Sequence, residues 1–218
     1  MNPTDTTQLY RKTKKVLWQE YPGTARSLCA LNFDTAYQLL VATILSAQCT
    51  DERVNLVTPK LFSRFGTPLK TSKADIGEIE KIIKSTGFYH AKSENILKMS
   101  KDLVYNYNKE VPSEMDTLVK LPGVGRKTAN VVLSVWFDKP GLPVDTHVLR
   151  VSNRIGLIQT KDPVKAELSL NKIVAPKDRG AFSIKLILHG RTTCSARKPK
   201  CEECKMKNFC LKINVEKA

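Results

Sequence analysis

The chain has 218 residues, of which 41% are hydrophobic and 26% are charged. That balance is typical of a folded globular protein and excludes an intrinsically disordered chain. Thirty-six Lys and Arg residues against 21 Asp and Glu residues give a net charge of +15. A positive surplus of this size favours binding to polyanions, with nucleic acid as the first candidate partner and an anionic membrane as the second.

The hydrophobic pattern argues against the membrane. The longest mostly apolar stretch, Leu39–Ala47, is far shorter than the roughly 20 residues that a membrane-spanning helix needs. The first residues also lack the basic-then-apolar pattern of a secretory signal. We therefore expect no membrane partner and a reducing, cytoplasmic environment, in which cysteines are not normally paired as disulfides.

Apolar residues recur with a helical period along nearly the whole chain. Asp34 or Thr35 is available to cap the second predicted helix. No segment shows the strict alternation between hairpin turns that predicts a β-sheet, so the expected fold class is all-α. In chain order the pattern predicts helices over residues 9–21, 33–48, 51–65, 76–85, 91–107, 113–121, 128–137, 146–157, 164–174 and 181–188.

Four of the six cysteines lie close together near the C-terminus. Six, two and five residues separate Cys194, Cys201, Cys204 and Cys210. Soft sulfur ligands suit zinc or an iron–sulfur cluster. Most four-cysteine zinc sites use two close pairs, whereas only the middle pair is close here. The spacing therefore favours an iron–sulfur cluster over zinc, with reduced, unliganded thiols as the third alternative.

A glycine-rich turn separates two of the predicted helices. Leu121-Pro122-Gly123-Val124-Gly125 permits a tight reversal with backbone N–H groups exposed at a helix N-terminus, which suits a phosphate oxygen. The segment is not a P-loop, because Arg126 stands between Gly125 and Lys127 and the flanking segments are helical. An ordinary corner between two helices is the alternative interpretation.

Two side chains near this turn can do chemistry. Lys127 lies beside Arg126 at a helix N-terminus, where the positive potential favours the neutral amine, and a neutral amine can attack carbon to form a Schiff base. A solvated lysine that contacts phosphate is the alternative. Asp145, in Val144-Asp145-Thr146-His147, precedes a predicted helix, so it is a helix cap, a reactive carboxylate, or both.

Together these motifs resemble the bacterial endonuclease III family, the DNA glycosylase/AP lyases of base excision repair within the helix–hairpin–helix-GPD superfamily. The match is carried by residues 121–132, by 144–147, by the four cysteines and by Leu45-Ser46-Ala47-Gln48. It runs over nearly the whole chain. The resemblance implies a [4Fe–4S] cluster held by Cys194, Cys201, Cys204 and Cys210.

The resemblance also implies the roles of individual residues. Lys127 matches the nucleophile that attacks C1′ of the damaged nucleotide. Asp145 matches the carboxylate that assists departure of the base and stabilises positive charge at the sugar. β-Elimination then cuts the strand 3′ to the lesion. The expected DNA contacts come from the hairpin, from two side chains that enter the base stack, and from the loop between the first two cysteines: Gly123, Gly125, Arg126, Gln48, Phe88, Arg197, Lys198 and Lys200.

The implied partner is double-stranded DNA that contains oxidised pyrimidines or abasic sites, bound by a monomer associated with the nucleoid. Phe88 stands where the family commonly has leucine, so the opposite-base preference is not carried over. The adenine-mismatch glycosylases fit less well because they lack a lysine at position 127, and the 8-oxoguanine lyases because they lack the cysteine pattern. Two alternatives from other classes are a non-catalytic DNA-binding module and a nuclease that has a structural zinc site and acts by metal-assisted hydrolysis.

The architecture implied by the family has two helical domains. Residues 29–139 would form a helical barrel that carries the hairpin, and residues 1–28 with 140–218 would form the iron–sulfur domain. By composition, Asp138–Pro143 is the best internal boundary. The DNA-binding active-site cleft would lie between the domains, with Lys127 and Asp145 facing each other across its mouth. The cluster would have a structural, positioning role.

Overall fold

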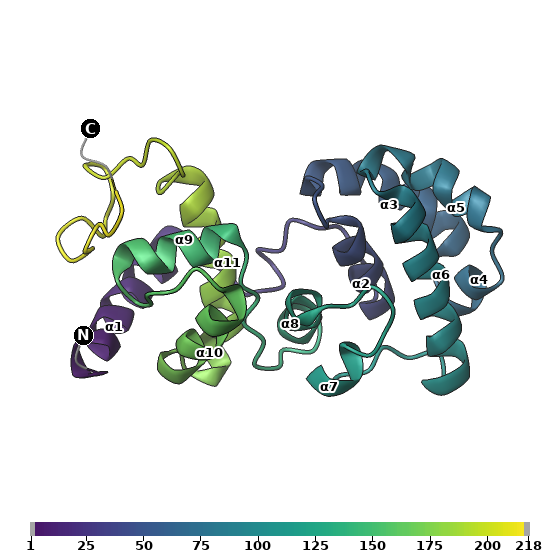
Figure 1. Cartoon of the computed structure of the whole chain (residues 1–218), viewed down its shortest axis with the longest axis horizontal. Helices are drawn as coiled ribbons and strands as arrows, with labels where there is room; N and C mark the ends of the chain where they lie inside the picture. Colours follow the sequence, from purple (N-terminus) through teal and green to yellow (C-terminus); the bar gives the residue numbers. More distant parts are fainter. Residues whose placement is uncertain (1–2, 216–218) are drawn as a thin grey trace. The chain divides into compact units, whose positions relative to one another are not determined.

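The computed structural model describes residues 3–215, and every regular element in that range is a helix, so the all-α prediction is confirmed. None of the described helices is both long and apolar enough to cross a bilayer. The helices, labelled in Figure 1, are α1 (Pro3–Glu20), α2 (Ala36–Leu45), α3 (Asp51–Phe65), α4 (Pro68–Ser72), α5 (Ile76–Ile83), η1 (Lys84–Thr86), α6 (Tyr89–Asn106), α7 (Met115–Leu118), α8 (Arg126–Val135), α9 (Thr146–Ile155), α10 (Pro163–Ile173), η2 (Pro176–Asp178) and α11 (Arg179–Thr192).

Four predicted helices are shorter than the sequence pattern indicated, α2 and α7 by the most. Helix α2 begins after Thr35, whose side-chain oxygen accepts a hydrogen bond from Gln38 N, and it ends before the turn that contains Gln48. Helix α7 covers only Met115–Leu118 of the predicted segment 113–121. The short helices α4 and η2 were not predicted. Both begin with a proline, which is favoured at a first helical position but also marks turns, and both are too short to show an apolar period.

The chain divides into two compact units, Cys29–Phe137 and the combination of Met1–Leu28 with Asp138–Ala218. In the first unit, α6 packs against α4 and α5, and α8 packs against both α2 and α7 (Figure 1). Leu39, Ile79 and Met99 are fully buried in this core. The core therefore fixes the ends of α2, α6 and α8, from which the predicted DNA contacts of this unit extend.

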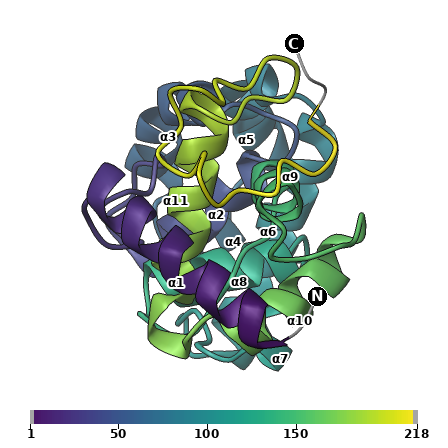
Figure 2. The same cartoon turned by 90° about the vertical axis from the view of Figure 1, so that its left-hand side faces the viewer.

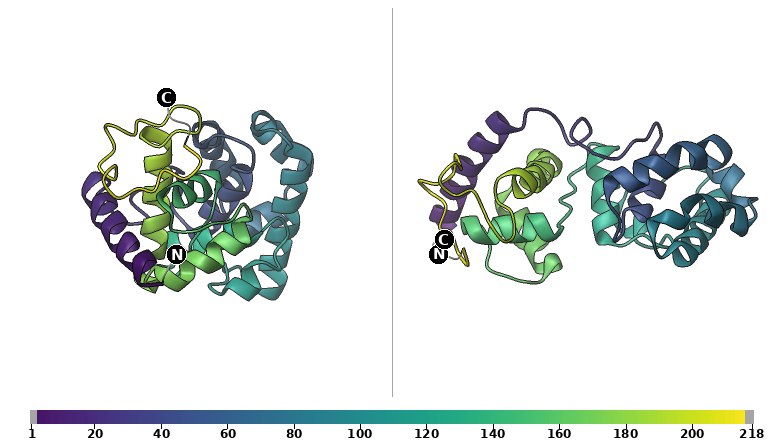
Figure 3. Two further views of the ribbon diagram at one scale, coloured as in Figure 1. Left: turned by 60° about the vertical axis from the view of Figure 1, so that its left-hand side comes forward. Right: turned by 90° about the horizontal axis from the view of Figure 1, so that it is seen from above.

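In the second unit, α11 packs against α1 and α9, as the views in Figure 3 also show. Its core includes Leu17, Val148, Phe182 and Met206. After α11 the chain has no further helix in the described residues, and residues 193–215 run beside α9 and α11 (Figure 2). Three of the four clustered cysteines, Cys194, Cys204 and Cys210, pack against this core.

Candidate nucleic-acid interface and cysteine site

The hairpin has the form that the glycine pattern predicted. Leu121 and Val124 are buried, and Val124 N donates to Leu121 O, which closes the turn. Gly123 has φ +76°, in the left-handed region that favours glycine. Gly125 is the N-cap of α8 and gives it no side-chain cap, and a helix start of this kind suits a phosphate oxygen.

The charged residues of the hairpin lie on its surface. Arg126 and Lys127 occupy the first turn of α8, and both are exposed, as are Gly123 and Gly125. An exposed amine next to uncapped N–H groups lies where the backbone of a bound nucleic acid can reach it. This position is compatible with either role considered for Lys127, a nucleophile or a phosphate contact.

Asp145 is the N-cap of α9. Its Oδ1 accepts a hydrogen bond from Val148 N at 2.8 Å, and the residue is half-buried. The cap that the sequence suggested is therefore present, and it fixes the orientation of the carboxylate. Asp145 lies in the unit that contains α9, whereas Lys127 lies in the unit Cys29–Phe137. Their predicted pairing stays a prediction.

Gln48 and Phe88 share an unusual backbone conformation that the sequence did not reveal. Gln48 has φ 53° and Phe88 has φ 49°, and both side chains are exposed, Phe88 to 67%. Left-handed conformations are uncommon outside glycine and cost about 1 kcal/mol or more, so the surrounding structure must impose them. The turn after α2 thus presents Gln48, and the turn before α6 presents Phe88.

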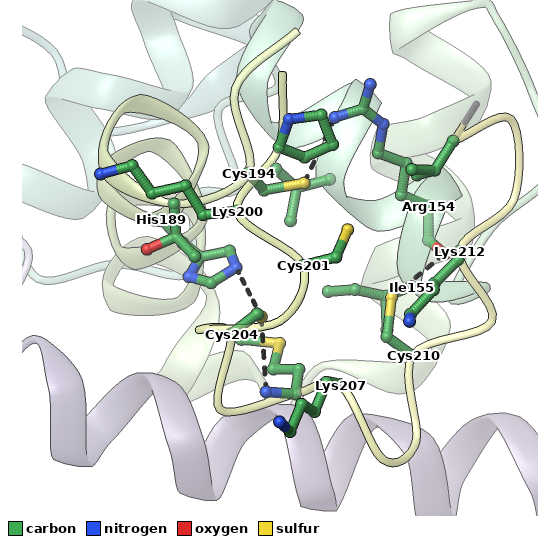
Figure 4. Close-up of a pocket in the computed structure, with 15 residues that line it drawn as sticks. Arg154, Ile155, His189, Cys194, Lys200, Cys201, Cys204, Lys207, Cys210 and Lys212 are labelled. Atoms are coloured by element: carbon green, nitrogen blue, oxygen red, sulfur yellow. Dashed lines mark hydrogen bonds between the residues drawn. The ribbon is translucent and has the colours of Figure 1, made fainter. Parts of the chain in front are cut away.

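The four clustered cysteines line one pocket together with Val151, Ile155 and Met206. Figure 4 shows them around the hollow, with Arg154 on one side and His189 on the other. Cys204 Sγ lies 3.6 Å from His189 Nε2 and accepts from Met206 N at 3.4 Å. No group of three or more His, Cys, Asp or Glu side chains among residues 3–215 is arranged to hold a single metal ion. Four sulfurs spread around one apolar hollow suit a larger group such as a cluster.

Burial shapes the chemistry of these side chains. It raises the pKa of the Cys204 and Cys210 thiols, and the other cysteines of the set raise it further when they are ionised. Such thiols hold their protons until a strong positive charge is bound among them, as iron supplies. Burial also lowers the pKa of His189 to about 4, so its ring is neutral at neutral pH.

Arg154 holds the loop between the first two cysteines, a role that the sequence analysis missed. Its guanidinium donates to Ser195 O at 2.6 Å, to Ala196 O at 2.7 Å and to Cys194 Sγ at 3.4 Å. Ser195 Oγ donates to Lys198 O, which closes the loop further. The side chains of the loop are consequently presented to solvent, and the exposed basic ones are Arg197, Lys198 and Lys200.

Comparison with known families covers most of the chain. The family model described as "HhH-GPD superfamily base excision DNA repair protein" matches residues 41–176. The model described as "Iron-sulfur binding domain of endonuclease III" matches residues 194–210. The cysteine set therefore belongs to an iron–sulfur protein, and the prediction of a [4Fe–4S] cluster in preference to zinc is confirmed.

Individual relatives agree with the family models. Endonuclease III of Synechocystis sp. is 48% identical over 196 residues, which cover 89% of this chain and 88% of the relative. A solved structure of a non-covalent endonuclease III–DNA complex is 39% identical, with a TM-score of 0.86 and 94% of each chain covered. A trapped covalent intermediate of endonuclease III with DNA is also 39% identical, with a TM-score of 0.87 and 94% and 95% of the two chains covered.

Proposed function

The chain belongs to the endonuclease III family within the HhH-GPD superfamily and is a DNA glycosylase of base excision repair; from that premise we propose that it removes oxidised pyrimidines from duplex DNA and then cleaves the strand as an AP lyase. The observation that carries the proposal is the position of Lys127, exposed on the first turn of α8 beside uncapped backbone N–H groups. There a phosphate held by the hairpin brings a sugar within reach of the amine.

In the proposed reaction, the lone pair of the neutral Lys127 amine forms a bond to C1′ of the damaged nucleotide. The bond from C1′ to the base breaks, and the base leaves with the electron pair and takes up a proton. The Asp145 carboxylate, oriented by its cap, stabilises the positive charge that develops at the sugar. One amine thereby replaces the base on the sugar.

Strand cleavage follows from the same bond. Opening of the sugar ring gives an iminium between C1′ and the Lys127 nitrogen, and the ring oxygen takes up a proton. The iminium acidifies the C2′ protons; loss of one expels the 3′ phosphate with the electrons of the C3′–O bond. Water then hydrolyses the iminium and frees the enzyme. A trapped covalent intermediate among the similar structures supports this proposal by analogy.

The remaining site residues are proposed to grip and open the DNA. Gly123, Gly125 and Arg126 would hold one phosphate at the N-terminus of α8. Gln48 and Phe88 would fill the gap that is left when the damaged nucleotide is flipped out of the stack. The [4Fe–4S] cluster, when bound, would cross-link the four cysteines and so fix the loop that presents Arg197, Lys198 and Lys200 to phosphates.

We also infer that the protein acts as a monomer on nucleoid DNA. A single chain supplies Lys127, Asp145 and all four cysteines, so no second copy is needed to complete the proposed site.

Borohydride trapping on duplex DNA with one thymine glycol tests the proposal. Borohydride reduces an iminium to a stable amine, so wild type should give a covalent protein–DNA adduct and Lys127→Ala should give none. Lys120→Ala is the matched control, because Lys120 is an exposed lysine on the preceding side of the same turn. It should form the adduct as wild type does.

The other outcomes separate the rival functions. An adduct on a bare abasic site but not on thymine glycol would keep the lyase and reject the substrate class. No adduct on either DNA would reduce Lys127 to a phosphate contact and favour the binding module. Strand cleavage that disappears in EDTA would favour the metal-dependent nuclease, because lysine-based elimination needs no divalent cation.

A further inference from the structure

Lys92 is a buried lysine in the unit Cys29–Phe137 that the proposed reaction does not use. It lies in the first turns of α6 and is only 5% exposed. Its Nζ donates to Leu45 O at 2.7 Å and to Thr86 O at 2.8 Å. Leu45 is the last residue of α2, and Thr86 is the last residue of η1. One ammonium group therefore joins two backbone segments that are far apart in the sequence.

Both carbonyls lie directly before the turns that present the proposed wedge side chains. Leu45 precedes Gln48 by three residues, and Thr86 precedes Phe88 by two. Gln48 and Phe88 are among the non-glycine residues with a left-handed backbone, a conformation that the surrounding structure must impose. Lys92 is thus bonded to the base of each turn, and the two turns cannot shift independently without breaking one of its hydrogen bonds.

The electrostatics explain why a lysine can be buried at this position. Desolvation disfavours its charge and lowers its pKa, so a group that served only to pack would be better as an apolar side chain. Leu45 O is one of the last four carbonyls of α2, which have no N–H partner within the helix, and it lies at the negative end of the helix dipole. Its charge-assisted hydrogen bond with Lys92 offsets part of the desolvation. The charge therefore indicates a specific linkage between the two turns.

We propose that Lys92 is a positioning residue for DNA opening: it holds Gln48 and Phe88 at a fixed separation and orientation, so that both side chains enter the base stack together when the damaged nucleotide leaves it. The inference rests on the proposed function, since it presumes that these two side chains are the wedges. A flipped-out nucleotide leaves a gap whose dimensions are set by the DNA, so two wedges that fill it must keep one spacing.

A matched control separates this role from ordinary stabilisation. Lys185, in the other unit, is fully buried, and its Nζ donates to Tyr21 O and to Gly23 O, the second at 2.9 Å. It also lies 4.9 Å from the centre of the Trp18 ring. Lys92→Met and Lys185→Met each remove one buried ammonium that bridges two carbonyls. Only Lys92→Met removes a link between the proposed wedges.

The test measures single-turnover base removal on duplex DNA with thymine glycol and a neighbouring 2-aminopurine, whose fluorescence rises when the stack opens. Lys92→Met should slow opening and base removal by about tenfold. Strand cleavage at an abasic site in a single-stranded oligonucleotide, which needs no opening, should change less than about twofold. Lys185→Met should keep both rates near wild type at a temperature where thermal melting shows all variants folded.

A double-mutant cycle supplies the readout that a purely structural role would not move. In a Gln48→Ala/Phe88→Ala background there are no wedges to position, so adding Lys92→Met should slow base removal by less than about twofold. An equal slowing in both backgrounds, on both DNAs, or with Lys185→Met would overturn the proposal. If Lys92→Met does not fold, Lys92→Gln, which keeps N–H donors on a shorter side chain, is measured in the same cycle with the same criteria.

The two proposals fail separately. If wild type opens the duplex, as seen by 2-aminopurine fluorescence, but gives no borohydride adduct, the lysine chemistry is refuted. The double-mutant cycle is then measured on the opening step alone. If wild type forms the adduct but Lys92→Met opens DNA at the wild-type rate, only the positioning role of Lys92 is refuted.

Discussion

Two alanine substitutions in the hairpin should separate a loss of stability from a loss of DNA affinity. Gly123→Ala should destabilise the fold. At φ +76° an L-residue costs roughly 1–2 kcal/mol. A Cβ at this position would also lie 2.8 Å from Asn95 Cβ, an atom whose place is fixed by the backbone of α6. Overpacking of this kind costs about 1–3 kcal/mol, so the free energy of unfolding should fall by about 2–5 kcal/mol.

Gly125→Ala should leave the stability nearly unchanged. Gly125 has φ −90° and ψ 174°, an extended conformation that any residue adopts, and a Cβ there would meet no atom within 4 Å. The loss should be about 0.5 kcal/mol, the small difference between glycine and alanine as an N-cap. The added methyl group would instead stand beside the N–H groups proposed to bind phosphate, so we expect affinity for abasic-site DNA to fall about tenfold.

Urea denaturation measures the first effect, and fluorescence anisotropy with labelled DNA measures the second. Gly87→Ala is a comparison without a steric contact: Gly87 has φ +68° and ψ 155°, a backbone region essentially restricted to glycine, but a Cβ there would meet nothing within 4 Å. Its loss should be about 1–3 kcal/mol, from the backbone alone. Equal stabilities for Gly123→Ala and Gly125→Ala would refute the reasoning, as would tighter DNA binding by Gly125→Ala.

Substitutions at three further positions address the other site residues. Asp145→Asn keeps a cap oxygen, so its melting temperature should stay near that of wild type while base removal is lost. Asp145→Ala should lose activity and also about 1 kcal/mol of stability, because the cap is lost. An active Asp145→Asn would contradict the proposed charge stabilisation. Arg154→Met removes the donors to Ser195 O and Ala196 O, so the cluster's visible absorption should bleach faster in air and DNA affinity should fall several-fold. An unchanged bleaching rate would show that Arg154 does not stabilise the cluster loop. Cys201→Ser should reduce folding yield or DNA affinity before it affects chemistry, and a folded, cluster-free Cys201→Ser protein with full DNA affinity would show that the cluster does not position the loop.

The helices could be predicted because their apolar period reflects a buried face, and α3 matches its predicted residues 51–65. The period fails where an element is too short to show one, as in the five-residue α4. Capping residues such as Thr35 and Asp145 were readable because the chemistry of a cap is local. The end of α2 was not readable, since the turn that follows it interrupts an apolar run that continues in the sequence.

The residues that hold the site together were missed for a different reason. Lys92 and Arg154 lie in helices among other polar residues, where the sequence pattern predicts solvated side chains. One acceptor of Lys92 is 47 residues away and the other is six, and the carbonyl acceptors of Arg154 are 41 and 42 residues away. Those partners are backbone carbonyls, which any residue type supplies. A bond to a distant carbonyl leaves no mark in the sequence of its acceptor, so the tertiary fold is needed to find it.

These buried cations limit what the net charge says about DNA binding. Lys92, Lys185 and Arg154 are directed at carbonyls of the protein, so their charges contribute no direct phosphate contact. The slope of log K against log salt is about −0.9 per phosphate contact. It should therefore reflect the exposed basic residues of the hairpin and loop and stay far shallower than a count based on +15 would give.

Lys198→Ala and Lys185→Met test this distinction, since each removes one lysine. Lys198 is exposed on the loop between the first two cysteines, whereas Lys185 is fully buried. Titrating DNA binding against salt should show the slope reduced by about 1 for Lys198→Ala and unchanged for Lys185→Met. If binding depended on net charge alone, the two variants would change the slope equally. A slope near zero in wild type would remove the phosphate contacts altogether and leave the basic surplus without a role in binding.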